Sequence, residues 1–547
     1  MRVRIRWPLS SFARAVTLAL LLAVGLSACG SSSGSPSGSS AGSAAVSKAA
    51  AKTASAMNLD CKGVKLGGTI TIGVNQDAIS FDPPYTQDNG SLWADMNIYD
   101  QLVRLTPNAS KLVPGLATSW KISNGGKTYT FTLRSAKFSN GDAVTAQDVA
   151  FSLERAASPK AFANVGLNVI ASTKVINTHT VQVTTKTISA PFLSDLALWP
   201  ASILDEKVFN KVGEKAFRDH PVGSGPFSVA SFSPGNEIVL KKNPYWWDTD
   251  SCGNHYPYLN EVVLKYIPDD NTRVTALQGG QVDAIFNVPY NEVSSLNSRT
   301  ITSAVTPQFG ADMFSLSEQV PAFRNTDVIQ AINYGIDRAA IAKTVFFGNA
   351  SPAESPMQPG IYFYTSKYGY PYDPAKAKAL MAQSGIKSFS ARLTIPSGNS
   401  IAAGIAQIFQ SEMAAIGGHI SIQQEDDTTL QTEQSANKLQ MAWTALTADI
   451  LDPSENALFC CVSNGGANAN YTGWKDAQAD ALYYAAQVTL NQAKRAQLYD
   501  KWQQIVMQKA PLIWLVYPTN TFAYQNDVHD LFLQPTAHYP LWVAWKS

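Results

Sequence analysis

Strict alternation of apolar and polar residues marks residues 128–133 as a strand. Tyr129, Phe131 and Leu133 are separated there by threonines, and a period of two is typical of a strand with one buried face. Further strands are predicted by apolar runs at residues 67–73, 238–240 and 262–267, the last two within a strand-rich stretch from 220 to 300. The first half of the chain is therefore expected to be rich in strands.

Helical periodicity dominates the second half. In the first half, one helix is predicted to start at Thr145, where the sequence nearly matches a capping box and Val149 and Leu153 supply an apolar stripe. In the second half the pattern predicts one helix behind a cap at Asn325 or Thr326, with an apolar stripe of Val328, Ile329, Ile332, Ile336 and Ile341. A second helix is predicted from Asp373–Pro374 to Gly385, and a third is capped by Ser400 and stops at Gly417. A fourth helix is predicted from Asn491 to Lys509, followed by a final strand over 512–517.

The first 28 residues have the pattern of a secretion leader. Arginines at positions 2, 4, 6 and 14 flank and precede a short apolar core over residues 15–26, and Ser27 and Ala28 then precede Cys29. The order from Leu26 to Gly30 resembles the bacterial lipoprotein lipobox, which implies that Cys29 carries a lipid and becomes the mature N-terminus. An ordinary signal peptide with an incidental cysteine is the alternative.

Residues 29–60 are predicted to form a disordered linker. Ser, Gly and Ala dominate this segment, and it has too few large apolar groups to offset its ordering entropy. The chain that follows is too long for one compact core and should divide into two lobes or more. Removing the four leader arginines leaves 38 basic and 41 acidic residues, a balance of −3 without any polybasic run, so nucleic acid is not expected as a partner.

Four cysteines remain after Cys29, and an even number in an exported protein favours disulfides. We expect a bond between Cys61 and Cys252, with the neighbours Cys460 and Cys461 either joined to each other or held as thiols. A bond from one of these neighbours to Cys252 is the alternative.

No catalytic constellation is found in the sequence. The six histidines lack the spacing of a helical zinc site, and neither a phosphate-binding loop nor a nucleophile elbow occurs. We therefore expect a binding protein, with no catalytic residue, no metal and no cofactor. An exported hydrolase with an unrecognised site is the less favoured alternative.

A series of segments, read in order, resembles the family-5 extracytoplasmic solute-binding proteins of ABC importers, the group of dipeptide-, oligopeptide- and nickel-binding proteins. Each segment alone also fits ordinary turn and cap chemistry, but the order is preserved over nearly all of residues 65–520. The matching segments are Pro114 to Trp120, Gly126 to Leu153, Pro221 to Phe227, Asn243 to Trp246, Ala276 to Asp283, Gln330 to Arg338, Tyr372 to Gly385 and Asp449 to Pro453.

The resemblance implies an α/β, two-lobed periplasmic-binding-protein-like fold of the class II type, with an enlarged first lobe, a hinge and a central cleft. The first lobe would comprise residues 61–303 together with 516–547, and the second lobe residues 304–515. Two chain crossings would form the hinge, and a ligand would be buried when the lobes close.

The resemblance also implies a ligand contact. Asp449 matches the position at which peptide-binding members hold the α-ammonium of a peptide, although Leu446 stands where those members have a tryptophan. A turn or cap role is the alternative for Asp449. Trp443, Trp93 and Tyr85 are candidate cleft aromatics, with core packing as the alternative for each.

The implied function is that of a lipid-anchored, extracytoplasmic receptor that captures a peptide or peptide-like solute and delivers it to an ABC permease and its ATPase subunits. We expect a monomer that touches the membrane only through its lipid. As alternatives, the same scaffold could bind a nickel chelate or an oligosaccharide, or it could act as a sensor that binds a signalling peptide without importing it.

Overall fold

The computed structural model describes residues 61–86, 88–161, 166–463, 471–536 and 538–547. The predicted leader (1–28), the lipidation site Cys29 and the predicted linker (29–60) lie outside these residues. The described residues belong to one compact unit. Within the described ranges, no helix combines the length and the apolar character that a membrane crossing requires.

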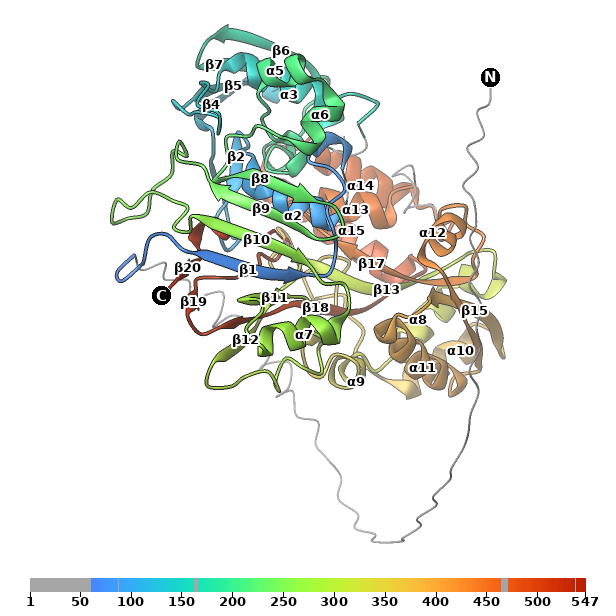
Figure 1. The fold of residues 1–547 in the computed structure, drawn as a ribbon. Coiled ribbons are helices and arrows are strands. Elements are labelled where there is room, and N and C mark those ends of the chain that lie inside the picture. Colours follow the sequence, from blue (N-terminus) through green and yellow to red (C-terminus); the bar gives the residue numbers. More distant parts are fainter. Residues whose placement is uncertain (1–60, 87, 162–165, 464–470, 537) are drawn as a thin grey trace, which may run out of the picture. The chain divides into compact units, whose positions relative to one another are not determined.

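A twelve-stranded mixed sheet runs through this unit (Figure 1). Ten strands follow one another in the order β16-β15-β17-β13-β18-β11-β1-β10-β9-β8, and β12 and β14 add to β18. The strands are β1 (Thr69–Val74), β8 (Phe227–Ser233), β9 (Glu237–Lys242), β10 (Glu261–Tyr266), β11 (Ala284–Phe286), β12 (Ile301–Pro307), β13 (Gly310–Leu316), β14 (Ala350–Pro352), β15 (Phe389–Pro396), β16 (Gly418–Glu425), β17 (Met441–Thr447) and β18 (Leu512–Gln525).

Strand β18 joins two parts of this sheet. Residues 512–516 pair with β13, whereas residues 519–525 pair with β12 and residues 522–524 with β11. We call the part that holds β1 and β8–β12 the first lobe, and the part that holds β13–β17 the second lobe. The chain passes from the first lobe to the second between β12 and β13, at residues 307–310, and β18 passes from the second lobe back to the first between residues 516 and 519. The residue limits given above for the lobes remain a prediction.

Alternate side chains of β18 enter different cores, as the pleat of a strand requires. Ile513 and Leu515 pack with α8 (Thr326–Tyr334), α9 (Arg338–Thr344), α10 (Pro374–Gln383) and α11 (Ser400–Ala414). Trp514 and Tyr517 pack with α13 (Ser454–Cys461), α14 (Ala477–Gln487) and α15 (Gln492–Lys509). In the first lobe, α7 (Asp270–Gln278) packs around Ala523, and α2 (Asn89–Ile98) belongs to the core that holds Phe522.

The sheet therefore has two distinct faces. Helices α7, α9, α10 and α11 lie together on one side of the strands in Figure 1, and we call this side the α11 face. Helices α2 and α13 belong to the opposite side, which we call the α13 face.

A second, four-stranded sheet enlarges the first lobe. Its order is β4-β5-β7-β6, and helix α3 (Ala146–Ala156) covers it with a core of its own. The strands are β4 (Ala117–Ser123), β5 (Thr128–Leu133), β6 (Ile170–Asn177) and β7 (Thr180–Thr185), and the other short elements of this lobe include β2 (Val103–Leu105), β3 (Leu112–Pro114), α4 (Phe192–Asp195), α5 (Glu206–Val212) and α6 (Glu214–Asp219). The predicted strand at 128–133 and the capping box of Thr145 with Asp148 are both confirmed.

Three predictions about elements of the second half were wrong. The single helix predicted to carry Val328 to Ile341 is broken, because α8 ends at Tyr334 and the side chain of Asp337 caps a new helix, α9. The cap of α11 is Asn399 rather than Ser400, and its side chain accepts a hydrogen bond from Ala402 N–H at 2.9 Å. The final strand is far longer than residues 512–517, because its distal half pairs with the first lobe.

Two disulfide bonds are present among the described residues. Cys61 is joined to Cys252 across 191 residues of sequence, and Cys460 is joined to its neighbour Cys461. The bridge from Cys460 or Cys461 to Cys252, considered above as an alternative, is therefore not formed.

Candidate functional site

The end of β17 places Asp449 next to the start of α13. One residue, Ala448, separates Asp449 from the last residue of the strand, and the chain then turns through Asp452 into the helix. The backbone N–H of Asp449 donates a hydrogen bond to Glu455 Oε2 at 2.8 Å, so the two acidic residues are held together. Asp452 Oδ1 accepts a hydrogen bond from Ser454 N–H, which begins α13.

The turn residue Asp452 is paired with a buried guanidinium. Arg495 of α15 donates two hydrogen bonds to Asp452, at 2.7 and 2.9 Å, and a third to the carbonyl oxygen of Ala486 at 3.0 Å. The side chains of Arg495 and Asp452 are only 1% and 3% exposed. Asp452 therefore has a structural role, as half of a buried ion pair.

Asp449 and Glu455 have no such counter-charge. Among the described residues, no lysine or arginine forms an ion pair with either carboxylate. Burial raises the pKa of Asp449 well above its ordinary value, and the charge of Glu455 raises it further. Burial also raises the pKa of Glu455 to about 7, although hydrogen bonds from backbone N–H groups act in the opposite direction. The site is thus acidic and costly to ionise without a cation.

The first lobe approaches this site directly. The backbone N–H of Ala190 donates to the carbonyl oxygen of Gln487 at 2.7 Å, and Ile450 packs with Leu198 and Trp199 of the first lobe. The lobes therefore contact each other on the α13 face, beside Asp449.

The same approach brings a further carboxylate, Asp195, at the end of α4. Its side chain is buried, and its Oδ2 atom has no hydrogen-bond partner among the residues that the structure describes. Burial raises the pKa of Asp195 well above its ordinary value, and the charges of Asp452 and Glu455 raise it further, whereas Arg495 lowers it.

The predicted aromatic residues lie in three separate elements, β17, α2 and a 3-10 helix. Trp443 of β17 is half-buried and packs with the core that holds α8–α11, on the face opposite to α13. Trp93 is buried in α2, with its ring centroid 5.2 Å from that of Tyr539. Tyr85 is half-buried in a 3-10 helix, with the Arg155 guanidinium 5.1 Å from its ring centroid. Ligand contact by these three residues, and by Asp449, stays a prediction.

Sequence reasoning missed three members of this neighbourhood: Glu455, Asp195 and Arg495. A signal exists for Glu455 alone, because it follows Asp452 by three residues at a helix start, the spacing of a capping box. Asp195 and Arg495 arrive from distant segments, and no local pattern announces them.

The described residues offer no free metal site. The one cluster of potential metal ligands among them is Cys61, Asp250 and Cys252, and the disulfide occupies both sulfur atoms.

Comparisons with known proteins agree with this architecture. Residues 111–468 match the model of the bacterial extracellular solute-binding proteins, family 5. The glutathione-binding protein GsiB of Salmonella typhimurium is 27% identical over 481 residues, covering 85% of this chain and 92% of that protein. Among solved structures, DppA of Helicobacter pylori in complex with the peptide STSA is 28% identical, with a TM-score of 0.75 over 88% of this chain and 98% of that one.

A further solved structure carries a different ligand. AgaA of A. tumefaciens R10, in complex with agropinic acid, is 26% identical, with a TM-score of 0.73 over 88% of this chain and 99% of that one. Relatives of almost equal similarity thus bind different solutes, whereas the two-lobed fold and the extracytoplasmic capture of a solute for an ABC importer are common ground. The chain belongs to the family-5 bacterial extracellular solute-binding proteins.

Proposed function

We propose that the captured solute is a peptide or peptide-like molecule with a free α-ammonium, and that Asp449 binds this group. The observation that carries the proposal is the half-buried Asp449, whose carboxylate has a raised pKa and no ion-pair partner among the described residues. A ligand ammonium would supply the missing positive charge, and a charge-assisted hydrogen bond is strong where water is excluded. The names of GsiB and of the DppA complex support a peptide ligand, since glutathione and STSA both carry such a group.

The rest of the machinery lies outside this chain. In this proposal the protein is no enzyme: it is a monomer that passes its solute to an ABC permease, and separate subunits hydrolyse ATP. The lipobox-like segment supports an anchor on Cys29 that holds the protein at the outer face of the cell membrane.

The first experiment is native mass spectrometry of the purified protein before and after mild denaturation. A released mass that fragments as a peptide supports the proposal. A non-peptide mass would change the substrate class, while the family assignment would stand.

The second experiment tests Asp449 directly by calorimetry with glutathione and Ser-Thr-Ser-Ala. Asp449→Asn should weaken binding of the peptide that binds by at least about tenfold, and so should N-acetylation of that peptide. Asp427→Asn is the matched control, because Asp427 is an exposed acid on α12 (Asp427–Ser435). Equal affinity of Asp449→Asn and the unaltered protein would remove Asp449 from the binding site.

A further inference from the structure

A hollow lies on the α11 face, away from Asp449. It encloses about 1620 Å³, its solvent-open side included, and we call it the hinge groove. Its first-lobe wall includes Asn75, Asn287 and Tyr290, and its second-lobe wall comes from α9, the turn at Phe347 and α11. Residues 519–521 of β18 also line it, at the point where this strand passes between the lobes.

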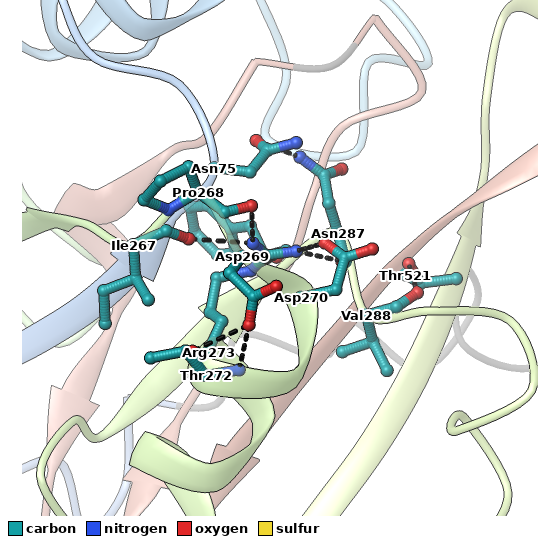
Figure 2. A network of polar contacts seen from close by, with 11 residues as sticks. Asn75, Ile267, Pro268, Asp269, Asp270, Thr272, Arg273, Asn287, Val288 and Thr521 are labelled. Atoms are coloured by element: carbon teal, nitrogen blue, oxygen red, sulfur yellow. Dashed lines mark hydrogen bonds and ion pairs between the residues drawn. The ribbon is translucent and has the colours of Figure 1, made fainter. Parts of the chain in front are cut away.

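The first-lobe wall of the groove is rigidly built (Figure 2). Arg273 of α7 is fully buried, and its guanidinium donates to the carbonyl oxygens of Phe286, Ile267, Pro268 and Asn287 and to Asp270 Oδ1. Asn287 in turn donates from its side chain to Asn75 Oδ1 at 2.8 Å. These bonds fix the ends of β1 and β11, from which the wall residues project.

Strand β18 is tied to the same wall. Thr521 Oγ1 donates to the carbonyl oxygen of Val288 at 2.7 Å, and the Tyr290 hydroxyl donates to the carbonyl oxygen of Thr519 at 2.9 Å. The first-lobe wall and the strand between the lobes therefore form one hydrogen-bonded unit, and a ligand would find it preorganised.

The groove has no uncompensated charge among its described lining residues. Asp270 is its one ionisable carboxylate, and Arg273 already pairs with it at 2.6 Å. An ammonium or carboxylate group on a ligand would find no free partner of opposite sign. This chemistry contrasts with the acidic neighbourhood of Asp449 on the other face.

Neutral hydrogen-bonding groups are abundant instead. The side chains of Gln308, Thr344, Ser400 and Gln407 line the groove and have no hydrogen-bond partner within the part of the chain that the structure describes. Amides and hydroxyls both donate and accept, as sugar hydroxyls do. Phe347 also lines the groove and is 61% exposed. Its ring adds an aromatic surface, and ligand sites commonly combine aromatic with polar side chains.

We propose that the hinge groove is a second binding site, for a neutral polyhydroxylated solute such as a disaccharide. The solute would contact both lobes on the α11 face of the sheet. This proposal is independent of the peptide proposal. Because a bound sugar would contact both lobes, it would stabilise the lobe arrangement that leaves the groove open. In the structure this arrangement coincides with contact between the lobes on the α13 face. Occupancy of the groove should therefore raise the affinity of the predicted cleft beside Asp449 for its own ligand. Reciprocity then requires the cleft ligand to raise sugar affinity by the same factor.

The test uses maltose, sucrose and trehalose as probes, with saturation-transfer NMR on the whole protein. Thermal shifts are avoided, because sugars stabilise proteins by exclusion from the surface without binding. We expect a dissociation constant in the range of about 1 mM for at least one disaccharide, and weakening by at least about tenfold in Gln407→Trp, which fills the groove. Ala414→Trp is the control, since Ala414 is exposed on the same helix and does not line the groove.

The outcomes separate this proposal from the peptide proposal. Sugar binding that persists in Asp449→Asn and is lost in Gln407→Trp supports the groove, whatever the result with peptides. No saturation transfer to any of the three sugars at about 10 mM would overturn it. Binding that survives Gln407→Trp and disappears in Asp449→Asn would also overturn it, because the sugar would then occupy the cleft.

Discussion

Arg495 binds Asp452 through two hydrogen bonds of 2.7 and 2.9 Å, and among the described residues it forms no ion pair with Asp449 or Glu455. A buried ion pair of this kind sets the charge of its surroundings, because the cation is no longer available to its other acidic neighbours. Among the described residues, neither Asp449 nor Glu455 forms an ion pair with a lysine or an arginine.

The Arg495–Asp452 pair should be essential for the stability of the second lobe. Arg495→Ala would leave a buried carboxylate without its partner, and we expect a loss of about 3–5 kcal/mol in the free energy of unfolding, measured by denaturant titration. Lys207→Ala is the control, because its ion pair with Asp142 is largely exposed and should contribute less than about 1 kcal/mol. Equal losses in the two variants would contradict a special role for the buried pair.

Peptide affinity should depend on pH through the acidic site. Burial raises the pKa of Asp449 and takes that of Glu455 to about 7, whereas a bound ammonium favours both ionised forms. Binding near neutral pH should therefore release protons, and affinity should rise as pH increases from about 6 to about 8. Affinity should fall again when the peptide's own ammonium loses its proton, near pH 8. Calorimetry in buffers of different ionisation enthalpy counts the protons, and uptake instead of release would contradict the prediction.

Asp312 on β13 should make the free energy of unfolding depend on pH. Burial raises its pKa from an ordinary 3.8 to about 7, so the folded state binds a proton that the unfolded state releases between these values. Stability should be highest below about pH 4 and should fall as pH rises through about 7, by up to about 4 kcal/mol from this group.

Asp312→Asn keeps the shape of the side chain and removes its charge. We expect this variant to lose that pH dependence and to be more stable than the unaltered protein at pH 8, in denaturant titrations at a series of pH values. Tyr290, the titratable group that Asp312 perturbs, keeps its proton throughout this range because burial raises its pKa. A parallel pH profile of variant and unaltered protein would show that Asp312 is ionised throughout.

Two adjacent residues at the start of α11 should differ in their contribution to the free energy of unfolding. Asn399→Ala should lower the free energy of unfolding by about 1 kcal/mol, because the hydrogen bond to Ala402 N–H is lost. Ser400→Ala should have almost no effect, since Ser400 is the first residue of the helix and is exposed. The reverse order of effects would restore Ser400 as the cap.

Local chemistry made many elements predictable. The capping box at Thr145, the Asp373–Pro374 helix start and the alternation at 128–133 depend on neighbours within a few residues, and these elements form where expected. The predicted helix through Ile336 failed because its apolar spacing continues across Gly335, while Asp337 supplies the cap of a separate helix.

The acidic neighbourhood shows where prediction from the sequence ends. Asp449 was singled out through its resemblance to a family position, but nothing local predicts that Asp195 of α4, Glu455 of α13 and Arg495 of α15 lie close to one another. Burial and charge coupling arise only when these elements pack together. The extent of β18 was missed for a similar reason, because its partner strands β11, β12, β13 and β14 all lie far earlier in the chain.

Strand β18 also has a consequence for how the protein is made. It contributes a strand to both lobes, yet it lies near the end of the chain, at Leu512–Gln525. During synthesis and export, which proceed from the N-terminus, neither half of the sheet can be completed until the last part of the chain has emerged. Nascent and truncated chains therefore expose unpaired edges of β13 and β12 at once, and the protein reaches its native state only as a whole.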